Sequence, residues 1–512
     1  MASRTVTLQR LAQQHRHHVH EPASPTLWTE QRQAKPAIPA SFEELRALAS
    51  FAFGASHGPL RAVREDPPPL SPALAEAIRQ AQECKCGTPL LDLFREGLRN
   101  PELTEDQLDQ LDGEAASAHP PLKKNYKTAN FSLFYNDTGD DILAQEKVSA
   151  ELVKEVGGHL EAAYARYAEA FGRAPYPTKG IAGPIRVEFY WLIGVYGSTE
   201  PDGPIALDSN WFTQLPRARR STATHELFHR LQYAFRAAVH FPTESWWSEG
   251  TAAWAGAWMS GGLIADFSWI QKMLGDKPES LYGLSYDAFP LWGFLQGQRS
   301  PTMPDEQEAV RPFLLRFADD GNAKAALISA LQVAFPNWRG SVNPDWYVNL
   351  FYLNAIGKHW LLQGGSDCYH AGKPLYERLV DFHGKEAEVP SVPWLLSDSR
   401  LSRGGKFEKG DEVLQASARV FKFTFEHACN GVRWRARVKV PKAGPLFFLS
   451  AAAFRAGQCV WNKPASPVAV GEPSLDYLID DAQYDSLFLV VSHHNRGGVD
   501  PGLFTLQLAV DA

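Results

Sequence analysis

The order of apolar and polar residues divides the chain into three stretches. Residues 1 to about 120 are polar and rich in Pro and Ala, and three consecutive prolines at 67–69 form a stiff break. Short helix candidates lie near residues 41–53, 71–83 and 101–112. We therefore predict that residues 1–120 form an N-terminal extension that wraps on a larger domain.

Residues 121 to about 400 show the periods of both strands and helices, which is typical of an α+β domain. Residues 131–135 and 185–193 are predicted strands, and the second is apolar enough to be central in its sheet. A bent edge strand is predicted over residues 196–208. Between the first two strands, a long amphipathic helix presents one apolar stripe, formed by Leu152, Val156, Leu160, Tyr164, Tyr167 and Phe171.

Beyond residue 249 the chain is predicted to be helical to about residue 400, and its pattern then changes again. Residues 401–512 hold short strand candidates separated by Gly, Pro and Asn, at 421–425, 433–440, 446–450, 487–492 and 504–510. We predict that they form a separate β-sandwich. An appended sandwich of this kind is either a scaffold or a binding module for a carbohydrate or protein ligand, and the sequence leaves both open.

One cluster of ionisable residues stands out within this pattern. His225 and His229 are four residues apart, so on a helix both imidazoles lie on one face and reach the same point. Glu226 projects about 100° round the helix, beside that point. Nineteen residues lie between His229 and Glu249, which stands just before a predicted helix over residues 251–259.

Chance is a poor explanation of this cluster. With 16 His and 58 acidic residues in 512 positions, about half of the latter being Glu, roughly 0.03 HExxH matches are expected. Residues 221–224 suit a helix start, and apolar positions follow at helical spacing. The alternative, two partly buried helices that carry these side chains by coincidence, leaves buried charges in need of partners.

Two histidines and one glutamate form a catalytic zinc set, with three protein ligands and the fourth position left to water. A glutamate beside such a metal is placed to act as a general base. The sequence therefore predicts Zn²⁺ as a cofactor, with His225, His229 and Glu249 as its ligands and Glu226 as the base.

HELFH, nineteen residues and then Glu-Gly-Thr-Ala resemble the gluzincin zinc metallopeptidases, the thermolysin- and aminopeptidase-like clan. The likeness is greatest to bacterial metallopeptidases with an HExFH…EGTA pattern. It spans residues 128–295 and is carried mainly by the zinc motif. It implies an α+β fold with a gluzincin-like catalytic domain over residues 121–400, composed of a mixed sheet and a helical lobe. The resemblance also implies that the edge strand before the zinc helix pairs with extended substrate.

Two features depart from the family pattern. The Gly-x-Met-Glu-Asn signature of the aminopeptidase branch is missing, which puts aminopeptidase activity in doubt. Thermolysin has an acidic residue four positions after its glutamate ligand, whereas this chain has Ala253 there. The partner that orients a zinc histidine is therefore not identified from the sequence.

Tyr286 resembles the tyrosine that donates to the oxyanion in the aminopeptidase-like branch, although the glycine usual soon after it is missing. A tyrosine in the core or on the surface is the alternative, and Tyr282 is a second candidate.

Cys86, in Cys86-Gly87-Thr88-Pro89, is the basis of a further hypothesis. This short segment is similar to the Cys-Gly-x-Pro core of the matrix-metallopeptidase prosegment, whose thiolate occupies the open zinc position. Zinc binds thiolate well, and a neighbouring lysine helps to keep the thiol deprotonated. Cys86 is thus a candidate inhibitory switch in residues 1–120; a buried or redox-active cysteine is the alternative.

Composition narrows the class of protein. The hydrophobic content of 44 %, with 15 Trp, fits a folded enzyme, and the net charge of −7 gives no reason to expect nucleic acid as a partner. No apolar run approaches the roughly 18 residues of a membrane span, and the N-terminus shows no secretory signal. Five cysteines imply no disulfide framework, so the compartment stays open. Histidines also gather near the N-terminus, where a solvated tail is favoured over a metal site, at His15, His17, His18 and His20.

These observations favour a zinc-dependent metallopeptidase, an endopeptidase acting on a peptide or protein substrate. A hydrolase of non-peptide amides shares the same zinc chemistry. From a different class, the alternative is a catalytically silent gluzincin-like scaffold that binds a ligand through its C-terminal β-sandwich. The presence of Glu226 weighs against that alternative, because binding alone does not require a general base.

Overall fold

The computed structural model describes residues 39, 41–98, 100–139, 142–175, 183–201, 203–235, 245–264, 279–297, 310–334, 380–381, 395–401, 406–413, 417–425, 434–440, 446–455, 458–467, 474–479, 486–494 and 502–510. The described residues up to 248, with 255–264, form one compact unit, and those from 279 onward form a second. The second also includes Glu249–Trp254, the middle of a helix that begins and ends in the first unit. The N-terminal histidine tract lies outside the described residues.

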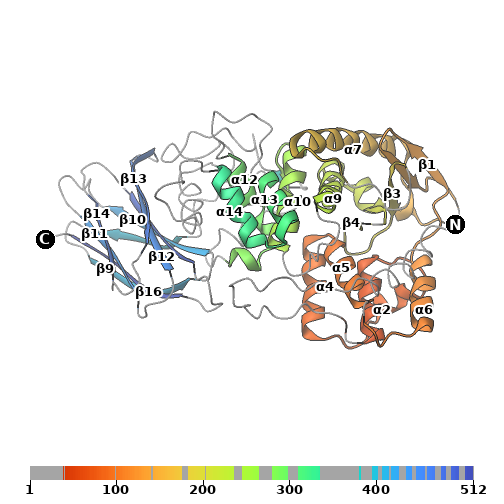
Figure 1. The fold of residues 1–512 in the computed structure, drawn as a ribbon, viewed down its shortest axis with the longest axis horizontal. Helices are drawn as coiled ribbons and strands as arrows, with labels where there is room; N and C mark the ends of the chain where they lie inside the picture. Colours follow the sequence, from red (N-terminus) through yellow and green to blue (C-terminus); the bar gives the residue numbers. More distant parts are fainter. Residues whose placement is uncertain are drawn as a thin grey trace. The chain divides into compact units, whose positions relative to one another are not determined.

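The first described part of the chain is a group of helices, drawn in red and orange in Figure 1. They are α2 Phe42–Ala52, α3 Gly58–Glu65, α4 Pro72–Cys84, α5 Thr88–Gly97 and α6 Glu105–Ala116. Ser41 caps α2 by accepting the N–H of Glu44 at 3.1 Å, and Thr104 and Gln107 form a capping box at the start of α6. The helices pack around a core of their own, which includes Leu45, Leu48, Leu60, Leu74, Ile78, Leu90, Phe94 and Leu111.

Helices α2, α4 and α6 lie where the sequence pattern predicts them, whereas α3 and α5 were not predicted. Pro59 and Pro89 stand in the first turns of these two helices, where the missing N–H has no intrahelical partner to lose. In the sequence alone, a proline in the first turn of a helix cannot be told from a proline in a loop, so these two helices were missed. The boundaries expected near residues 120 and 400, and the role of residues 1–120 as a prosegment, stay predictions.

A mixed five-stranded sheet follows, in the order β1-β2-β3-β5-β4. Its strands are β1 Lys124–Lys127, β2 Phe131–Tyr135, β3 Ile185–Tyr190, β4 Gly197–Thr199 and β5 Ile205–Asp208. The central β3 pairs in parallel with β2 and β5, which agrees with its continuous apolar sequence. β1 is antiparallel to β2, and β4 is antiparallel to β5 at the other edge. The edge strand predicted over 196–208 is confirmed by β4, but the segment forms two strands, because Pro201 and Pro204 cannot donate to a ladder and separate β4 from β5.

Helix α7, Ala150–Phe171, confirms the predicted amphipathic helix. Most of its apolar stripe is buried, and near its end Tyr167 and Phe171 pack their rings on Phe228 at centroid distances of 5.3 and 5.5 Å. The Tyr167 hydroxyl also donates to the backbone oxygen of Thr224 at 3.1 Å. These contacts hold helix α9, Ala218–Phe235, which carries both histidines of the HExxH motif.

Asp208 connects the sheet to the helices that follow it. The residue ends β5 and caps α8, Ser209–Gln214, accepting the N–H groups of Asn210 and Trp211 at 3.2 Å each. The N–H of Leu192 donates to the same carboxylate at 3.1 Å. Burial raises the pKa of Asp208 to about 7, and these three N–H donors oppose the rise.

Helix α10, Ser245–Met259, confirms the helix predicted over 251–259 and begins six residues earlier. The buried Trp246 and Trp247 lie in its first turn, and Glu249 is inside the helix. The second unit continues with α12 Phe289–Gly297, α13 Val310–Asp320 and α14 Ala323–Ala334. Over the described residues, the helices lack the length and apolar character needed to cross a membrane.

The C-terminal part is composed of two sheets, ordered β13-β12-β15-β10-β8 and β14-β11-β16-β9. Side chains from both sheets share one core that includes Phe421, Phe423, Trp434, Phe447, Leu489, Phe504 and Leu506. This arrangement agrees with the predicted strand-rich C-terminal region. The strand bounds are β8 Leu395–Leu401, β9 Lys406–Val413, β10 Ser417–Phe425, β11 Trp434–Lys439, β12 Leu446–Arg455, β13 Gln458–Pro467, β14 Ser474–Ile479, β15 Ser486–His494 and β16 Gly502–Val510.

The prediction of helix to about residue 400 is wrong at its end, since β7 Val380–Asp381 and β8 are strands. β8, β9, β13 and β14 were not predicted as strands, and these four are the edge strands of the two sheets. An edge strand covers less apolar surface and carries more polar residues, so its sequence shows a weak strand pattern. Residues 335–379 lie outside the described part of the chain.

Candidate metal centre

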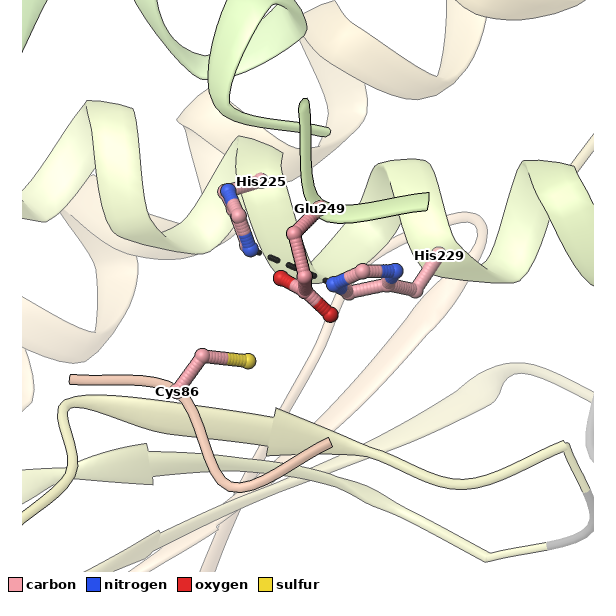
Figure 2. Close-up of side chains that lie close together, drawn as sticks. All are labelled: Cys86, His225, His229 and Glu249. Atoms are coloured by element: carbon pink, nitrogen blue, oxygen red, sulfur yellow. Dashed lines mark hydrogen bonds between the residues drawn. The ribbon is translucent and has the colours of Figure 1, made fainter. Parts of the chain in front are cut away.

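Helix α9 presents His225 and His229 on one face, as their spacing predicts (Figure 2). Their Nε2 atoms lie 3.2 Å apart, and the two rings are nearly perpendicular at 81°. Both side chains are buried. Two nitrogens bound to one tetrahedral zinc at about 2.05 Å would be about 3.3 Å apart, so the imidazoles already stand at the separation that a shared metal requires.

Glu249 reaches the same point from helix α10. On either side of the residue, α10 is held against α9 within the first unit. The side chain of Gln232 donates to Ser248 O at 2.7 Å, and a Cβ on Gly256 would lie 2.9 Å from Ser221 O. Gly256 therefore lets the two helices approach closely, and the helix positions Glu249 as a rigid element.

Cys86 completes the group. One ligand atom from each of Cys86, His225, His229 and Glu249 lies within 4.8 Å of the others, and all four residues are buried. Figure 2 shows the thiol pointing toward the other three from a separate segment of chain. Imidazole nitrogen, carboxylate oxygen and thiolate sulfur are the donors zinc prefers, and ideal zinc ligands lie about 3.3–3.7 Å apart. The set fits zinc once the side chains move together by about an ångström.

Gln232 orients one of the histidines. Its Oε1 lies 2.8 Å from Nδ1 of His229, while its Nε2 donates to Ser248 O. The second contact fixes which way the amide points, so Oε1 faces the ring and His229 carries its proton on Nδ1. The bare Nε2 then faces the group. Gln232 thus orients His229, a role for which the sequence showed no acidic residue. Ala253, four positions after Glu249, is a buried apolar residue of α10 and cannot take that role.

Glu226 lies beside the group and is held from the sheet side. Its Oε2 accepts from the hydroxyls of Thr199 at 2.7 Å and Thr88 at 3.3 Å, and its Oε1 accepts from the Cys86 thiol at 3.4 Å. The carboxylate also packs on Gly197, where an added Cβ would lie 2.8 Å from Oε1. Only a glycine at 197 leaves room for this side chain.

The structure therefore brings together five of the six predicted site residues. Tyr286 lies in the second unit, in the turn η4 Tyr286–Ala288, and its role as an oxyanion donor stays a prediction. Tyr282 packs under Lys324, with Nζ 4.4 Å from the ring centroid. Sequence reasoning missed Gln232, Thr199 and Thr88. The contact of Gln232 with His229 could have been predicted from the sequence, because residues three positions apart share a helix face.

Comparisons with known proteins add little. No family model matches the sequence, and no curated protein matches it. Among solved structures, the chain is similar to the pre-peptidase C-terminal domain of collagenase from Bacillus anthracis, with 13 % identity over 22 % of this chain and 95 % of that chain and a TM-score of 0.15. It is also similar to the M60 catalytic domain with the CBM51-1 and CBM51-2 domains of Clostridium perfringens ZmpB. That likeness has 10 % identity over 80 % of this chain and 62 % of that chain, and a TM-score of 0.26. At such TM-scores neither likeness carries an argument.

Proposed function

We propose that the protein is a zinc-dependent metallopeptidase. The observation that carries this proposal is the pairing of a buried His-His-Glu donor set with a separate carboxylate, Glu226, held beside it by Thr199. A site that only binds a metal needs the donors but not the second carboxylate. His225, His229 and Glu249 hold the metal in this proposal, and Glu226 is the general base.

An endopeptidase is favoured by the edge strand of the sheet. Strand β4 lies at that edge, close to Glu226, and its backbone groups are bonded by residues on both sides of Cys86. The N–H of Tyr196 donates to Lys85 O, and Gly197 O accepts from the N–H of Gly87 at 2.8 Å. This edge can therefore bind the backbone of an extended peptide on both sides of the residue that lies nearest the metal group. An endopeptidase needs backbone contacts on both sides of the scissile bond.

Bound zinc supplies Lewis-acid chemistry, polarising a carbonyl and lowering the pKa of water. Within the chain, the Thr199 hydroxyl occupies Oε2 of Glu226. Oε1 accepts from the Cys86 thiol, so it takes the proton of the attacking water once that thiol has left. The same oxygen then returns the proton to the departing amine. Burial of Glu226 and its neighbours excludes bulk water and keeps the carboxylate in one orientation.

Two further assignments belong to this proposal. Tyr286 donates a hydrogen bond to the oxyanion that forms as the carbonyl is attacked. The substrate is a peptide or protein, and the C-terminal sheets serve as a scaffold or bind a carbohydrate or protein ligand.

A second candidate function is a catalytically silent scaffold. One observation favours it: with Cys86 the group offers four protein ligands, the number found in closed structural zinc sites. In that case the metal would stabilise the fold, and binding would reside in the C-terminal sheets.

Glu226→Gln separates the two functions. The amide is nearly isosteric, so zinc content should match the parent while turnover of a mixed peptide library falls about 10²- to 10⁴-fold. Both proteins are assayed with and without chelator, with Cys86 intact and in a Cys86→Ser background. Glu169→Gln, exposed on α7, is the matched control and should change neither quantity. If Glu226→Gln binds full zinc and its turnover is unchanged, Glu226 is not the base. If the zinc-loaded protein with Glu226 cleaves no peptide, either with Cys86 intact or as Cys86→Ser, the silent scaffold is supported.

A further inference from the structure

We propose that residues 85–88, here called the plug, are a built-in inhibitor of the metal site. In this proposal Cys86 supplies the fourth ligand to the metal, and Thr88 holds the general base. The plug connects helices α4 and α5 and lies in the same compact unit as the HExxH helix. The inference rests on the proposed function, because it assigns the regulation of that same site.

The thiol of Cys86 is positioned by contacts on two sides. Its Sγ lies within 4.8 Å of the ligand atoms of His225, His229 and Glu249. The N–H of Thr88, at the start of helix α5, donates to the sulfur at 3.4 Å, and the thiol donates to Oε1 of Glu226 at 3.4 Å. Coordination forms one sulfur–zinc bond and releases the thiol proton to solvent. The position that attacking water needs is then closed.

The plug also occupies the sheet edge that extended substrate would use. It forms a parallel bridge between Cys86 and Gly197, with the backbone bonds at Tyr196 and Gly197 described above. The hydroxyl of Thr88 accepts the N–H of Thr199 at 2.9 Å, which satisfies the next group along the edge. A peptide that pairs with this edge must therefore displace the plug.

The plug differs from a substrate in what it presents to the metal. A substrate presents the carbonyl of its scissile bond, whereas the plug presents the sulfur of Cys86. The carbonyl of Lys85 is turned to the N–H of Tyr196. The plug can thus remain in the site without being cleaved.

The local backbone is shaped for this position. Lys85 has a φ of 64°, and over the described residues no other non-glycine residue has a positive φ. Lys85 is the C-cap of α4, a position where left-handed residues are common, and it turns the chain from the helix into the plug. Gly87 fits because an added Cβ would lie 3.0 Å from Ser198 Cβ and 3.1 Å from Ala52 O.

Contacts beyond the plug fasten the helical group to the sheet domain. Arg95 of α5 donates to Glu200, just beyond β4, at 3.2 Å. Ser56 and His57 both reach Oε1 of the buried Glu146, at 3.1 and 2.7 Å. Because the group has its own core as well as these contacts, the plug is held in place by a folded body. Displacement of that body, or modification of the thiol, opens the site.

Cobalt substitution and peptidase assays on the full-length chain test the proposal. Parent protein loaded with Co²⁺ should show the near-ultraviolet absorption of a cobalt–thiolate bond. Cys86→Ser should lose this band and keep the metal. Its peptidase rate should rise at least about tenfold, because a plug bound nine-tenths of the time leaves one molecule in ten active and the variant frees the others. Cys84→Ser, two positions away at the end of α4, is the matched control and should behave as the parent.

The outcomes separate this inference from the proposed function. Two results overturn the plug and leave the peptidase intact. The first is a parent protein that lacks the thiolate band. The second is a parent whose measurable, Glu226-dependent peptidase rate is the same as that of Cys86→Ser. A thiolate band in the parent with no cleavage by any variant overturns both and favours a closed structural zinc.

A measurement on the unaltered protein avoids dependence on a substitution. Zinc X-ray absorption on the full-length protein should show one sulfur in the coordination shell of the metal. A shell of only nitrogen and oxygen contradicts the coordination of the Cys86 sulfur.

Discussion

Replacing Gln232 with Met tests whether the second contact of His229 builds the metal site. Methionine keeps the length and volume of the glutamine but cannot accept from Nδ1 of His229 or donate to Ser248 O. Without the acceptor, the ring is free to rotate and to adopt the other tautomer, so Nε2 is no longer directed at the group. Losses of this kind lower metal affinity about 10- to 100-fold, or about 1.4–2.8 kcal/mol.

The same substitution destabilises the metal-free fold. The buried Nδ1 of His229 loses this acceptor, at about 1–3 kcal/mol, and the backbone oxygen of Ser248 loses one donor. Gln232→Glu separates the two effects. Its carboxylate still accepts from Nδ1, so zinc affinity should stay near the parent value, while the lost donor to Ser248 O lowers stability.

Competition with a chromophoric zinc chelator gives the affinity, and urea unfolding of the metal-free protein gives the stability. Gln214→Met, on the exposed side of α8, is the matched control and should stay within about 0.5 kcal/mol of the parent in stability. If folded Gln232→Met binds zinc within twofold of the parent, Gln232 does not orient His229.

Two further predictions concern other residues. Tyr286→Phe should leave zinc binding unchanged and lower kcat with little change in KM, because the hydroxyl acts only as charge develops; a wild-type kcat in steady-state assays would remove Tyr286 from the mechanism. Burial raises the pKa of Asp208 from its ordinary value of 3.8 to about 7 in the folded protein. Its contribution to stability is therefore complete below about pH 4 and is lost as the pH rises to about 7. About three pKa units correspond to about 4 kcal/mol, so Asp208→Asn should unfold at higher temperature than the parent at pH 8, with the gap closing toward pH 4; a gap independent of pH contradicts the raised pKa.

Local patterns determined much of the fold and the centre of the site. The i, i+4 spacing of His225 and His229 is a property of one helix, so their convergence follows from the sequence as soon as that helix forms. The stripe of α7 and the apolar run of β3 are equally local, because burial on a helix face or inside a sheet demands a period that is visible in the residues themselves. Cys86 was named from a short motif, but the motif gave no position for it.

The tertiary structure decided which distant residues meet. Thr88 and Thr199 hold Glu226 across 138 and 27 positions of chain, and such pairings are set by how the helical group packs on the sheet edge. The same holds for the four edge strands of the C-terminal sheets, whose polar sequences form strands because a neighbouring strand supplies the hydrogen bonds. Gln232 is the intermediate case: its helix face was readable from the sequence, but its orientation depends on Ser248 of α10. A side chain's place on its own helix is a local property, whereas its partner is chosen by the packing of the whole domain.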